Sequence, residues 1–268
     1  MKSRNEKNWR FIDSGAADGA FNMAADEALA RYCNPEMPIL RVYHWQPFAI
    51  SIGYHQRLAE IDSNKCRKDG VDVVRRPTGG RAIFHAHEVT YCVIIPRKSV
   101  WYQENTLAVY NQISSALVQA LYQLGLSVVL ERIENLSPES AQYHERFACF
   151  SASAKYEIHF EGKKLVGSAQ RRFNNAILQH GSIILGDEHL RLFDYLSANG
   201  NGSARQAREQ LQQRTVCLES ILKRQVDYEE VAAALRLGFE EYFGVVLEPA
   251  QLSLQELQRI NELKPKDT

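Results

Sequence analysis

The segment from Val89 to Ile95 carries apolar side chains on both of its alternating faces. A strand of this kind is stable only where both faces of its sheet are covered, so the chain must fold into layers around a buried sheet. Other segments of strand character alternate irregularly with a few longer amphipathic segments, and no regular strand-helix-strand repeat is present. These patterns predict an α+β fold in which a mixed β-sheet forms the core and helices pack on it.

Local sequence signals place the elements up to residue 185. Small residues predict a first helix, and apolar residues spaced three or four apart predict a long second helix that stops at Gly125. A turn at Glu161 and Gly162, where glycine can adopt positive φ, predicts a hairpin. The predicted elements are a helix over 21–33, a pair of strands over 39–45 and 49–54, a strand over 71–75, a helix over 107–124, hairpin arms over 156–160 and 164–169, and a strand over 177–185.

The C-terminal part of the chain has a different character. Residues 197–213 are polar and rich in glycine and asparagine at their start, which predicts a mobile loop or linker. Three helices follow, and the pairs Asp227 with Glu230 and Ser253 with Glu256 have the spacing of capping boxes. We expect a single domain over 1–268 with a short helical extension from about residue 215. The apolar face expected for the second of these helices consists of Tyr228, Val231, Leu235, Phe239 and Tyr242.

Charge and cysteine content exclude several classes of function. In 268 residues Lys and Arg total 32 and Asp and Glu total 32, so the surface as a whole has no net field that would attract nucleic acid or an anionic membrane. The charged N-terminus and the lack of any apolar run of about 18 residues predict a soluble, cytoplasmic protein. The cysteines have no CxxC spacing and are expected to be reduced thiols, with no metal site. They are Cys33, Cys66, Cys92, Cys149 and Cys217.

An arginine-rich loop, RRPTGGR, is the main candidate for an anion site. Gly79 and Gly80 allow a tight turn and let backbone amides approach a ligand, while Arg75, Arg76 and Arg81 have the donors to bind carboxylate or phosphate oxygens. The loop lacks the GxxxxGK[ST] pattern and runs into a strand-like segment, so it is not a nucleotide P-loop. A hairpin turn with solvated arginines remains the alternative interpretation.

A cysteine and a lysine are candidates for acyl chemistry. Cys149 would be a nucleophile if a cation lowered its pKa, and a small buried hydrophobic residue is the alternative. Cys92, inside the apolar strand, is expected to be such a buried residue. Strand alternation sends Lys163 and Lys164 to opposite faces, so one of them can point inward. The histidines that lack a partner at metal-ligand spacing, and that we expect to be hydrogen-bonded or on the surface, are His85, His87 and His180.

Several segments, in one order and at similar spacing, resemble the lipoate-protein ligase and octanoyltransferase family, whose catalytic domain is also similar to that of biotin-protein ligases. These segments are WRFIDSG (9–15), FNMAADEAL (21–29), ISIGYHQ (50–56), RRPTGGRAIFH (75–85), KKLVGSAQRR (163–172) and LQHGSIIL (178–185). The resemblance covers residues 9 to about 245 and implies the fold of those catalytic domains. The segment ERFACFSASAKYE (145–157) resembles LipM-type octanoyltransferases, in which a cysteine precedes the hairpin. Ligases that activate lipoate with ATP typically lack that cysteine and often carry an accessory C-terminal domain. In this sequence only short helices are expected after the catalytic domain.

The resemblance implies an acyltransferase that needs no cofactor. Octanoyl would pass from octanoyl-acyl carrier protein to Cys149, as an acyl-thioester intermediate, and then to a lysine of an apo lipoyl domain in the first step of lipoate biosynthesis. The acceptors implied are the glycine-cleavage H protein and 2-oxoacid dehydrogenase E2 subunits. Lys164 would favour the thiolate and, with backbone amides near Gly79, Gly80 or Gly167, stabilise the oxyanion.

The same resemblance supplies the expected substrate-binding residues. They are Arg75, Arg76, Thr78, Gly79, Gly80, Arg81, His85, Tyr91, Gly167, Ser168, Ala169 and His180. Ile83 and Tyr91 are expected walls of an apolar slot for the octanoyl chain. One position departs from the family pattern, because Ala86 follows His85 where the family usually has Asp. The role of a carboxylate in orienting His85 or binding a metal is therefore in doubt.

Three other activities remain open at this stage. An ATP-dependent lipoate-protein ligase would form product from octanoate, ATP and a lipoyl domain without any acyl carrier protein. A lipoyl-domain amidotransferase would take octanoyl from a second lipoyl domain. A non-catalytic acyl-binding module would retain its ligand in a Cys149→Ala variant.

Overall fold

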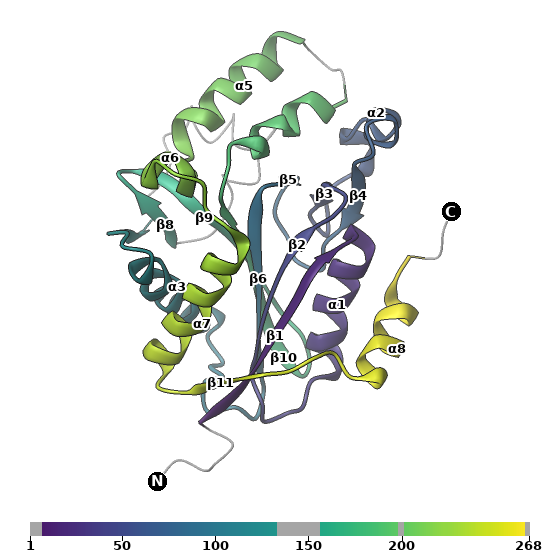
Figure 1. Cartoon of the computed structure of the whole chain (residues 1–268). Coiled ribbons are helices and arrows are strands. Elements are labelled where there is room, and N and C mark those ends of the chain that lie inside the picture. Colours follow the sequence, from purple (N-terminus) through teal and green to yellow (C-terminus); the bar gives the residue numbers. More distant parts are fainter. Residues whose placement is uncertain (1–6, 133–155, 198–200, 266–268) are drawn as a thin grey trace.

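A computed structural model describes residues 7–132, 156–197 and 201–265 of the protein. In this described part, the main sheet has eight strands in the order β11-β1-β2-β6-β10-β9-β8-β7 (Figure 1). β1 is parallel to both of its neighbours, and the other neighbouring strands are antiparallel. The strands are β1 (Asn8–Ala17), β2 (Ile39–Trp45), β6 (Glu88–Pro96), β7 (Val129–Arg132), β8 (Tyr156–Phe160), β9 (Lys163–Arg172), β10 (Ala176–Ile184) and β11 (Val246–Pro249).

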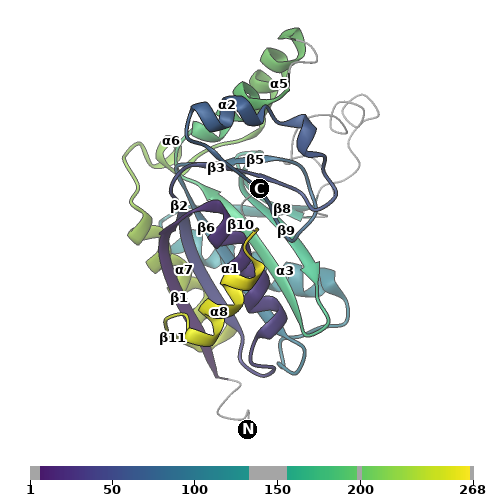
Figure 2. The same ribbon diagram turned by 90° about the vertical axis from the view of Figure 1, so that its right-hand side faces the viewer.

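A smaller sheet of three strands lies beyond one end of the main sheet (Figures 1 and 2). Its central strand β3 (Ala49–Ile52) is parallel to β4 (Asp72–Arg75) and antiparallel to β5 (Ile83–His85). The α-helices are α1 (Gly19–Tyr32), α2 (Ser63–Lys68), α3 (Thr106–Gln123), α5 (Asn201–Arg214), α6 (Leu218–Leu222), α7 (Tyr228–Phe243) and α8 (Leu254–Leu263), and the 3-10 helices are η2 (Leu58–Glu60) and η4 (Glu188–Tyr195).

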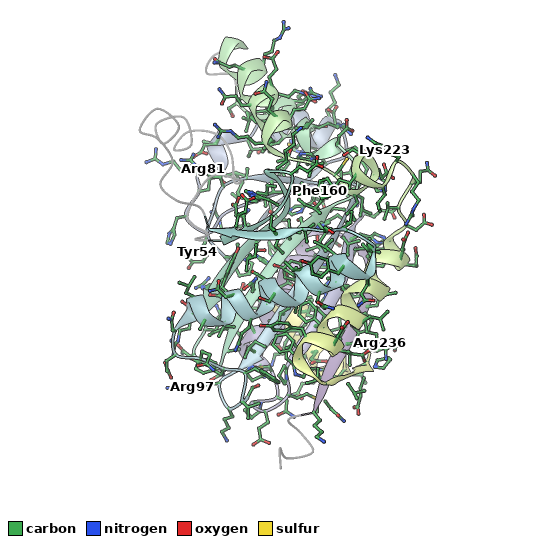
Figure 3. All side chains as sticks on the ribbon, turned by 90° about the vertical axis from the view of Figure 1, so that its left-hand side faces the viewer. Tyr54, Arg81, Arg97, Phe160, Lys223 and Arg236 are labelled. Carbon is green, nitrogen blue, oxygen red and sulfur yellow. The ribbon has the colours of Figure 1, made fainter. Side chains whose placement is uncertain are left out.

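Helices cover both faces of the main sheet. α1 packs on one face, with α8 against the outer side of α1, and α3 and α7 pack together on the other face, which Figure 3 views. Every residue of β6 is buried, with Val93 in the core below α3 and α7 and Ile94 in the core below α1. The predicted strand with two covered faces, and with it the α+β fold, is confirmed. Within the described residues, no helix is long and apolar enough to cross a membrane.

Local signals in the sequence begin and end several elements, and the signals at Gly125 and at Ser253 with Glu256 were predicted. The carboxylate of Asp18 accepts a hydrogen bond from the Phe21 amide at 2.6 Å and caps α1. Gly125 follows α3 with a φ of 79°, a conformation that glycine adopts without strain. Ser253 and Glu256 form the expected capping box of α8. The elements predicted up to residue 185 are present, with ends that differ by a few residues.

The strands predicted as a pair, 39–45 and 49–54, lie in different sheets. β2 lies between β1 and β6, so both of its hydrogen-bonding edges are occupied. After a link of three residues, β3 pairs instead with β4 and β5. Pairing by chain order was wrong here because β2 is an inner strand of the main sheet.

The segment predicted as a mobile loop or linker is helical over most of its length. α5 begins at Asn201, and Ala207 and Leu211 lie one turn apart on it. Both are buried against Leu190 and Phe193 of η4. This short apolar contact stabilises the helix, although the composition of the segment is polar.

The C-terminal part differs from prediction in three further details. Among the described residues, the Asp227 side chain accepts no capping hydrogen bond, and Arg224 binds the Glu230 carboxylate that would have completed the box. Tyr242 is 43% exposed, and Phe243 is buried in its place. β11 was not predicted, and its parallel pairing with β1 makes the C-terminal part an edge of the main sheet.

Candidate active site

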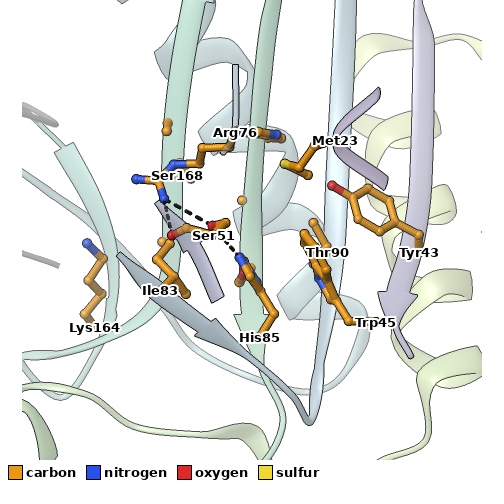
Figure 4. Close-up of a pocket in the computed structure, with 15 residues that line it drawn as sticks. Met23, Tyr43, Trp45, Ser51, Arg76, Ile83, His85, Thr90, Lys164 and Ser168 are labelled. Carbon is orange, nitrogen blue, oxygen red and sulfur yellow. Dashed lines mark hydrogen bonds between the residues drawn. The ribbon is translucent and has the colours of Figure 1, made fainter. Parts of the chain in front are cut away.

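A cavity lies between the two sheets, next to α1 (Figure 4). The space inside it, part of which is open to solvent, is about 440 Å³. The lining residues are Met23, Tyr43, Trp45, Ser51, Arg76, Ile83, His85, Thr90, Lys164, Gly167, Ser168, Ala169, His180, Gly181 and Ser182. The cavity thus brings together Lys164 and half of the residues predicted to bind substrate. The predicted residues outside its lining are Arg75, Thr78, Gly79, Gly80, Arg81 and Tyr91.

Lys164 lines the cavity, whereas Lys163 is exposed, as strand alternation predicts. The Lys164 side chain is only 7% exposed, and its ammonium is paired with the carboxylate of Glu157 on β8. Burial would raise the pKa of Glu157, but the charge of Lys164 and hydrogen bonds from His159 and Lys164 keep it below its ordinary value. A buried ion pair therefore stands at this end of the cavity.

The wall formed by β9 and β10 depends on a close approach of the two backbones. A Cβ atom at position 181 would lie 2.1 Å from the carbonyl oxygen of Gly167, so Gly181 is required there. The hydroxyl of Ser168 is hydrogen-bonded to that of Tyr91 at 2.7 Å. Tyr91 was an expected wall of the slot, but it lies behind this wall in the core and holds Ser168 in place.

The loop between β4 and β5 is held by its own arginines. Arg75 donates from Nη1 to three backbone carbonyls of residues 53–56 at 2.8–2.9 Å. Arg76 is 3% exposed and donates to the carbonyls of Gly79 and Arg81 at 2.6–3.1 Å. The alternative of solvated arginines is wrong for Arg76, and Arg75, although exposed, is bound to backbone.

Two glycines let this loop approach β3. A Cβ atom on Gly53 would lie 1.7 Å from the carbonyl oxygen of Gly80, which is closer than any side chain allows. Gly80 itself has a φ of 93°, a conformation that favours glycine. The amide of Tyr54 also donates to the carbonyl of Thr78 at 2.8 Å. The shape of the loop is therefore fixed by contacts within the protein.

A buried charge network beneath the cavity was not predicted. Arg41 on β2 and Asp26 on α1 form an ion pair at 2.7 Å, and both side chains are fully buried. The other oxygen of Asp26 accepts a hydrogen bond from Tyr43 and is bonded to Nδ1 of His180, both at 2.8 Å. Nε2 of His180 is hydrogen-bonded to Thr78 at 2.7 Å. Burial would raise the pKa of Asp26, but the His180 hydrogen bond and the Arg41 charge lower it overall.

This network connects α1 to the arginine-rich loop through His180. The available signal in the sequence was Asn22 and Asp26, polar residues four positions apart in FNMAADEAL. Asn22 also accepts a hydrogen bond from Arg41 at 2.8 Å. Polar side chains on the otherwise apolar face of a small-residue helix indicate a buried polar contact.

His85 is held between two polar partners on another side of the cavity. Its Nε2 is hydrogen-bonded to Ser51 at 2.7 Å and its Nδ1 to Glu88 at 2.8 Å, while the ring stacks on Trp45 at 4.1 Å. Glu88 therefore supplies the carboxylate that orients His85, although Ala86 stands at the family position for one. Burial would raise the pKa of Glu88, but the charge and hydrogen bond of His85 and two hydroxyl donors lower it.

The predicted nucleophile, Cys149, lies outside the described residues. The four described cysteines are free thiols, and none of these four lines the cavity. Burial raises the pKa of Cys33 and of Cys66 to about 11 and that of Cys92 well above its ordinary value. These three thiols are therefore poor nucleophiles near neutral pH, and Cys92 is a buried residue as predicted.

Comparison with known proteins gives the family of this chain. The model of the lipoyl protein ligase A/B catalytic domain matches residues 18–240. The chain belongs to this family. Its relatives include proteins named Octanoyltransferase LipM from Lysinibacillus sphaericus (34% identical, 96% of this chain and 95% of the relative), Bacillus subtilis (35%, 96% and 94%) and Kyrpidia tusciae (37%, 97% and 96%).

Solved structures show the lipoyl protein ligase fold in distant relatives. A bipartite lipoate protein ligase from Thermoplasma acidophilum has a TM-score of 0.78 at 20% identity, over 96% of this chain and 92% of its own. A lipoate-protein ligase A bound with ATP has a TM-score of 0.73 at 22% identity, over 96% of this chain and 94% of its own. The predicted lipoate-ligase-like catalytic fold is confirmed.

Proposed function

We propose that this protein is an octanoyltransferase that moves octanoyl from octanoyl-acyl carrier protein, through a thioester on Cys149, to a lysine of an apo lipoyl domain. The observation that carries the proposal is its similarity, at 33–37% identity and over at least 95% of the chain, to proteins named Octanoyltransferase LipM. The lipoyl domains proposed as acceptors are the glycine-cleavage H protein and the 2-oxoacid dehydrogenase E2 subunit. An E2 lipoyl domain is named with the Thermoplasma ligase of the same fold.

The cavity is suited to an acyl chain with a reactive carbonyl at one end. Figure 4 places Lys164 at one end of the lining and Met23 and Tyr43 at the other. Each buried methylene contributes about 0.8 kcal/mol, so an octanoyl chain gains about 5 kcal/mol by entering. We propose that the chain lies along Ile83 and Trp45 toward Met23, with its carbonyl near Lys164.

In the first step, the Cys149 thiolate attacks the thioester of octanoyl-acyl carrier protein. The positive charge of Lys164, which the Glu157 carboxylate holds in place, favours the thiolate over the thiol. The same ammonium, with backbone amides near Gly167, stabilises the oxyanion of the tetrahedral intermediate. The pantetheine sulfur takes the proton that Cys149 gave up and leaves as a thiol, and octanoyl remains on Cys149.

In the second step, the lysine amine of a lipoyl domain attacks the octanoyl-enzyme. Exchange of one thioester for another is nearly neutral in free energy, and the amide product is more stable than a thioester. The sequence of two steps therefore needs neither ATP nor a cofactor. The absence of any described cysteine from the cavity lining supports Cys149 as the carrier of the acyl group.

The arginine-rich loop and the adjoining strand β5 form one wall of the cavity through Arg76 of the loop and Ile83 and His85 of the strand. We propose that Arg81, an arginine of the same loop, meets the phosphate of the pantetheine arm. Arg81 is partly buried and lies on the side of the molecule that also carries Tyr54 (Figure 3). Gly79 and Gly80 would admit the thioester arm beside it.

We also propose that residues 1–268 act as one catalytic domain. The helical part beyond residue 215 packs α7 on α3 and adds β11 to the main sheet. Its removal would expose the apolar side chains of the core that α3 and α7 share.

The test is intact-mass analysis after the protein is mixed with octanoyl-acyl carrier protein. We expect an octanoyl adduct that hydroxylamine removes, that is absent in Cys149→Ala and that persists in the control Cys33→Ala. Addition of an apo lipoyl domain should discharge the adduct and octanoylate that domain. If the wild type stays unmodified while octanoate and ATP give a bound adenylate, the protein is a ligase and the proposal is wrong.

A further inference from the structure

Four side chains form a continuous series of contacts from the cavity to the surface. Lys164 is paired with Glu157, Nε2 of His159 lies 3.2 Å from Glu157 Oε2, and Nδ1 of His159 lies 2.8 Å from Glu131 Oε2. The exposed fraction of these side chains rises along the series, from 7% for Lys164 through 10% and 15% to 44% for Glu131. Only its outer end is in broad contact with water.

Strand pairing places these groups on one face of the sheet. Glu157 and His159 are two residues apart on β8, and side chains with this spacing share a face. In the ladder, Glu131 of β7 is opposite Glu157, and Lys164 of β9 is opposite His159. The series therefore crosses three neighbouring strands by direct and diagonal contacts.

The proposed reaction releases one proton in each turnover, and only in its second step. The lysine of the lipoyl domain enters as an ammonium and ends as an amide nitrogen, so it loses two protons as the C–N bond forms. The C–S bond breaks with its electron pair on the Cys149 sulfur, which takes one of these protons to become a thiol. The other proton must reach water. The first step exchanges one thiol for another and releases none.

We propose that Glu157, His159 and Glu131 are a proton outlet that carries this proton from Lys164 to solvent. The inference rests on the proposed function, in which Lys164 stands beside the reacting thioester. Its ammonium gives a proton to Glu157, and the amine so formed takes one proton from the attacking lysine. His159 gives its Nδ1 proton through Glu131 to water. The imidazole ring then rotates, so that its deprotonated nitrogen faces Glu157. Glu157 gives this nitrogen the proton that Glu157 has taken from Lys164.

The charges around His159 suit such a transfer. The groups that face it are Glu131 on β7, Glu157 on its own strand and Lys164 on β9, and Tyr110 of α3 lies near Glu157. The hydrogen bond to Glu157 raises the pKa of His159 above its ordinary value and outweighs burial, and Glu131 adds to the effect. An imidazole that binds and releases protons near neutral pH is the usual group for a proton shuttle.

The other histidines of the cavity lead only to buried groups. His180 is bonded to Asp26, which is fully buried, and His85 is bonded to Glu88, whose side chain is 4% exposed. In the proposed second step the acyl chain and the acceptor lysine would occupy the mouth of the cavity and exclude water from that route. Among the described residues that line the cavity, Lys164 is the one connected through a histidine to an exposed carboxylate.

The test measures the two steps separately in His159→Gln. Octanoyl-enzyme formation from octanoyl-acyl carrier protein should keep the wild-type rate. Discharge of the isolated octanoyl-enzyme by an apo lipoyl domain, followed by rapid quenching and intact mass, should slow on the order of a hundredfold in dilute buffer. Free imidazole in the buffer should restore much of the lost rate, because it can carry the proton in place of the His159 ring. Imidazole would not restore the rate if the substitution had instead displaced residues that line the cavity.

His87→Gln is the matched control, since His87 is an exposed histidine, 42% accessible, outside the cavity lining. Glu131→Gln changes the exposed end and should give a smaller loss confined to the second step. Three results in His159→Gln would each refute the proton outlet. They are equal slowing of both steps, discharge of the octanoyl-enzyme at the wild-type rate, and a slower discharge that imidazole does not accelerate. If the wild type forms no octanoyl-enzyme, the proposed function itself fails, which is a distinct result.

Discussion

The pair Lys164 and Glu157 allows stability and catalysis to be separated. Lys164→Met removes the ammonium and leaves the Glu157 carboxylate, 10% exposed, with His159 in place of the ion pair. Breaking a buried ion pair from one side costs about 3–5 kcal/mol, so the free energy of unfolding should fall by about that amount. Loss of one donor to the developing oxyanion costs about 3 kcal/mol of barrier, so octanoyl-enzyme formation should slow on the order of a hundredfold or more.

The double variant Lys164→Met with Glu157→Gln distinguishes the two effects. A neutral amide no longer needs a cation, so most of the lost stability should return while the acylation rate stays low. Urea unfolding at pH 7 measures the first quantity, and the rate of adduct formation by intact mass measures the second. Recovery of the acylation rate in the double variant, or a loss of less than about 1 kcal/mol in the single one, would refute the reasoning.

Three further predictions concern the loop, the buried network and acid stability. Gly53→Ala puts a Cβ atom 1.7 Å from the Gly80 carbonyl oxygen, so the loop must move. We expect a loss of about 2 kcal/mol or more in unfolding free energy together with loss of transfer, and an unchanged melting temperature would contradict the contact. Arg41→Met leaves Asp26 fully buried without its cation and should cost about 3–5 kcal/mol by urea unfolding, with a rise in the pKa of Asp26. The pKa of Glu88 lies below its ordinary 4.5, so its contribution to stability is present above that pH and is lost as pH falls through the folded-state pKa. Glu88→Gln should therefore flatten the pH dependence of the unfolding free energy in acid, and an equal slope in both proteins would argue against it.

The order and kind of most elements could be predicted from the sequence, because they depend on periodicities that neighbouring residues set. The run from Val89 to Ile95 required two covered faces, and the structure has them. Partners of strands could not be predicted in this way. β3 does not pair with β2, because β1 and β6 already occupy both edges of β2. In the same way, α5 is stabilised by contacts of Ala207 and Leu211 with η4 that its polar composition does not indicate.

The candidate site, too, could be predicted only in part from the sequence. Sequence alone determined that one of two adjacent lysines faces inward, that RRPTGGR is a tight loop without P-loop context, and that the motifs are those of a lipoyl ligase family. These properties depend on strand alternation, on glycine and on local order in the chain.

Only the tertiary structure decided which groups face each other in the cavity. Asp26 meets His180 across 154 positions of the chain, and Ser51 meets His85 across 34, because the two sheets and α1 converge there. The series from Lys164 to Glu131 depends on the register of three strands, which a shift by one residue would turn to the opposite face. Hydrogen-bond partners between distant residues follow from packing and register, which no local pattern encodes.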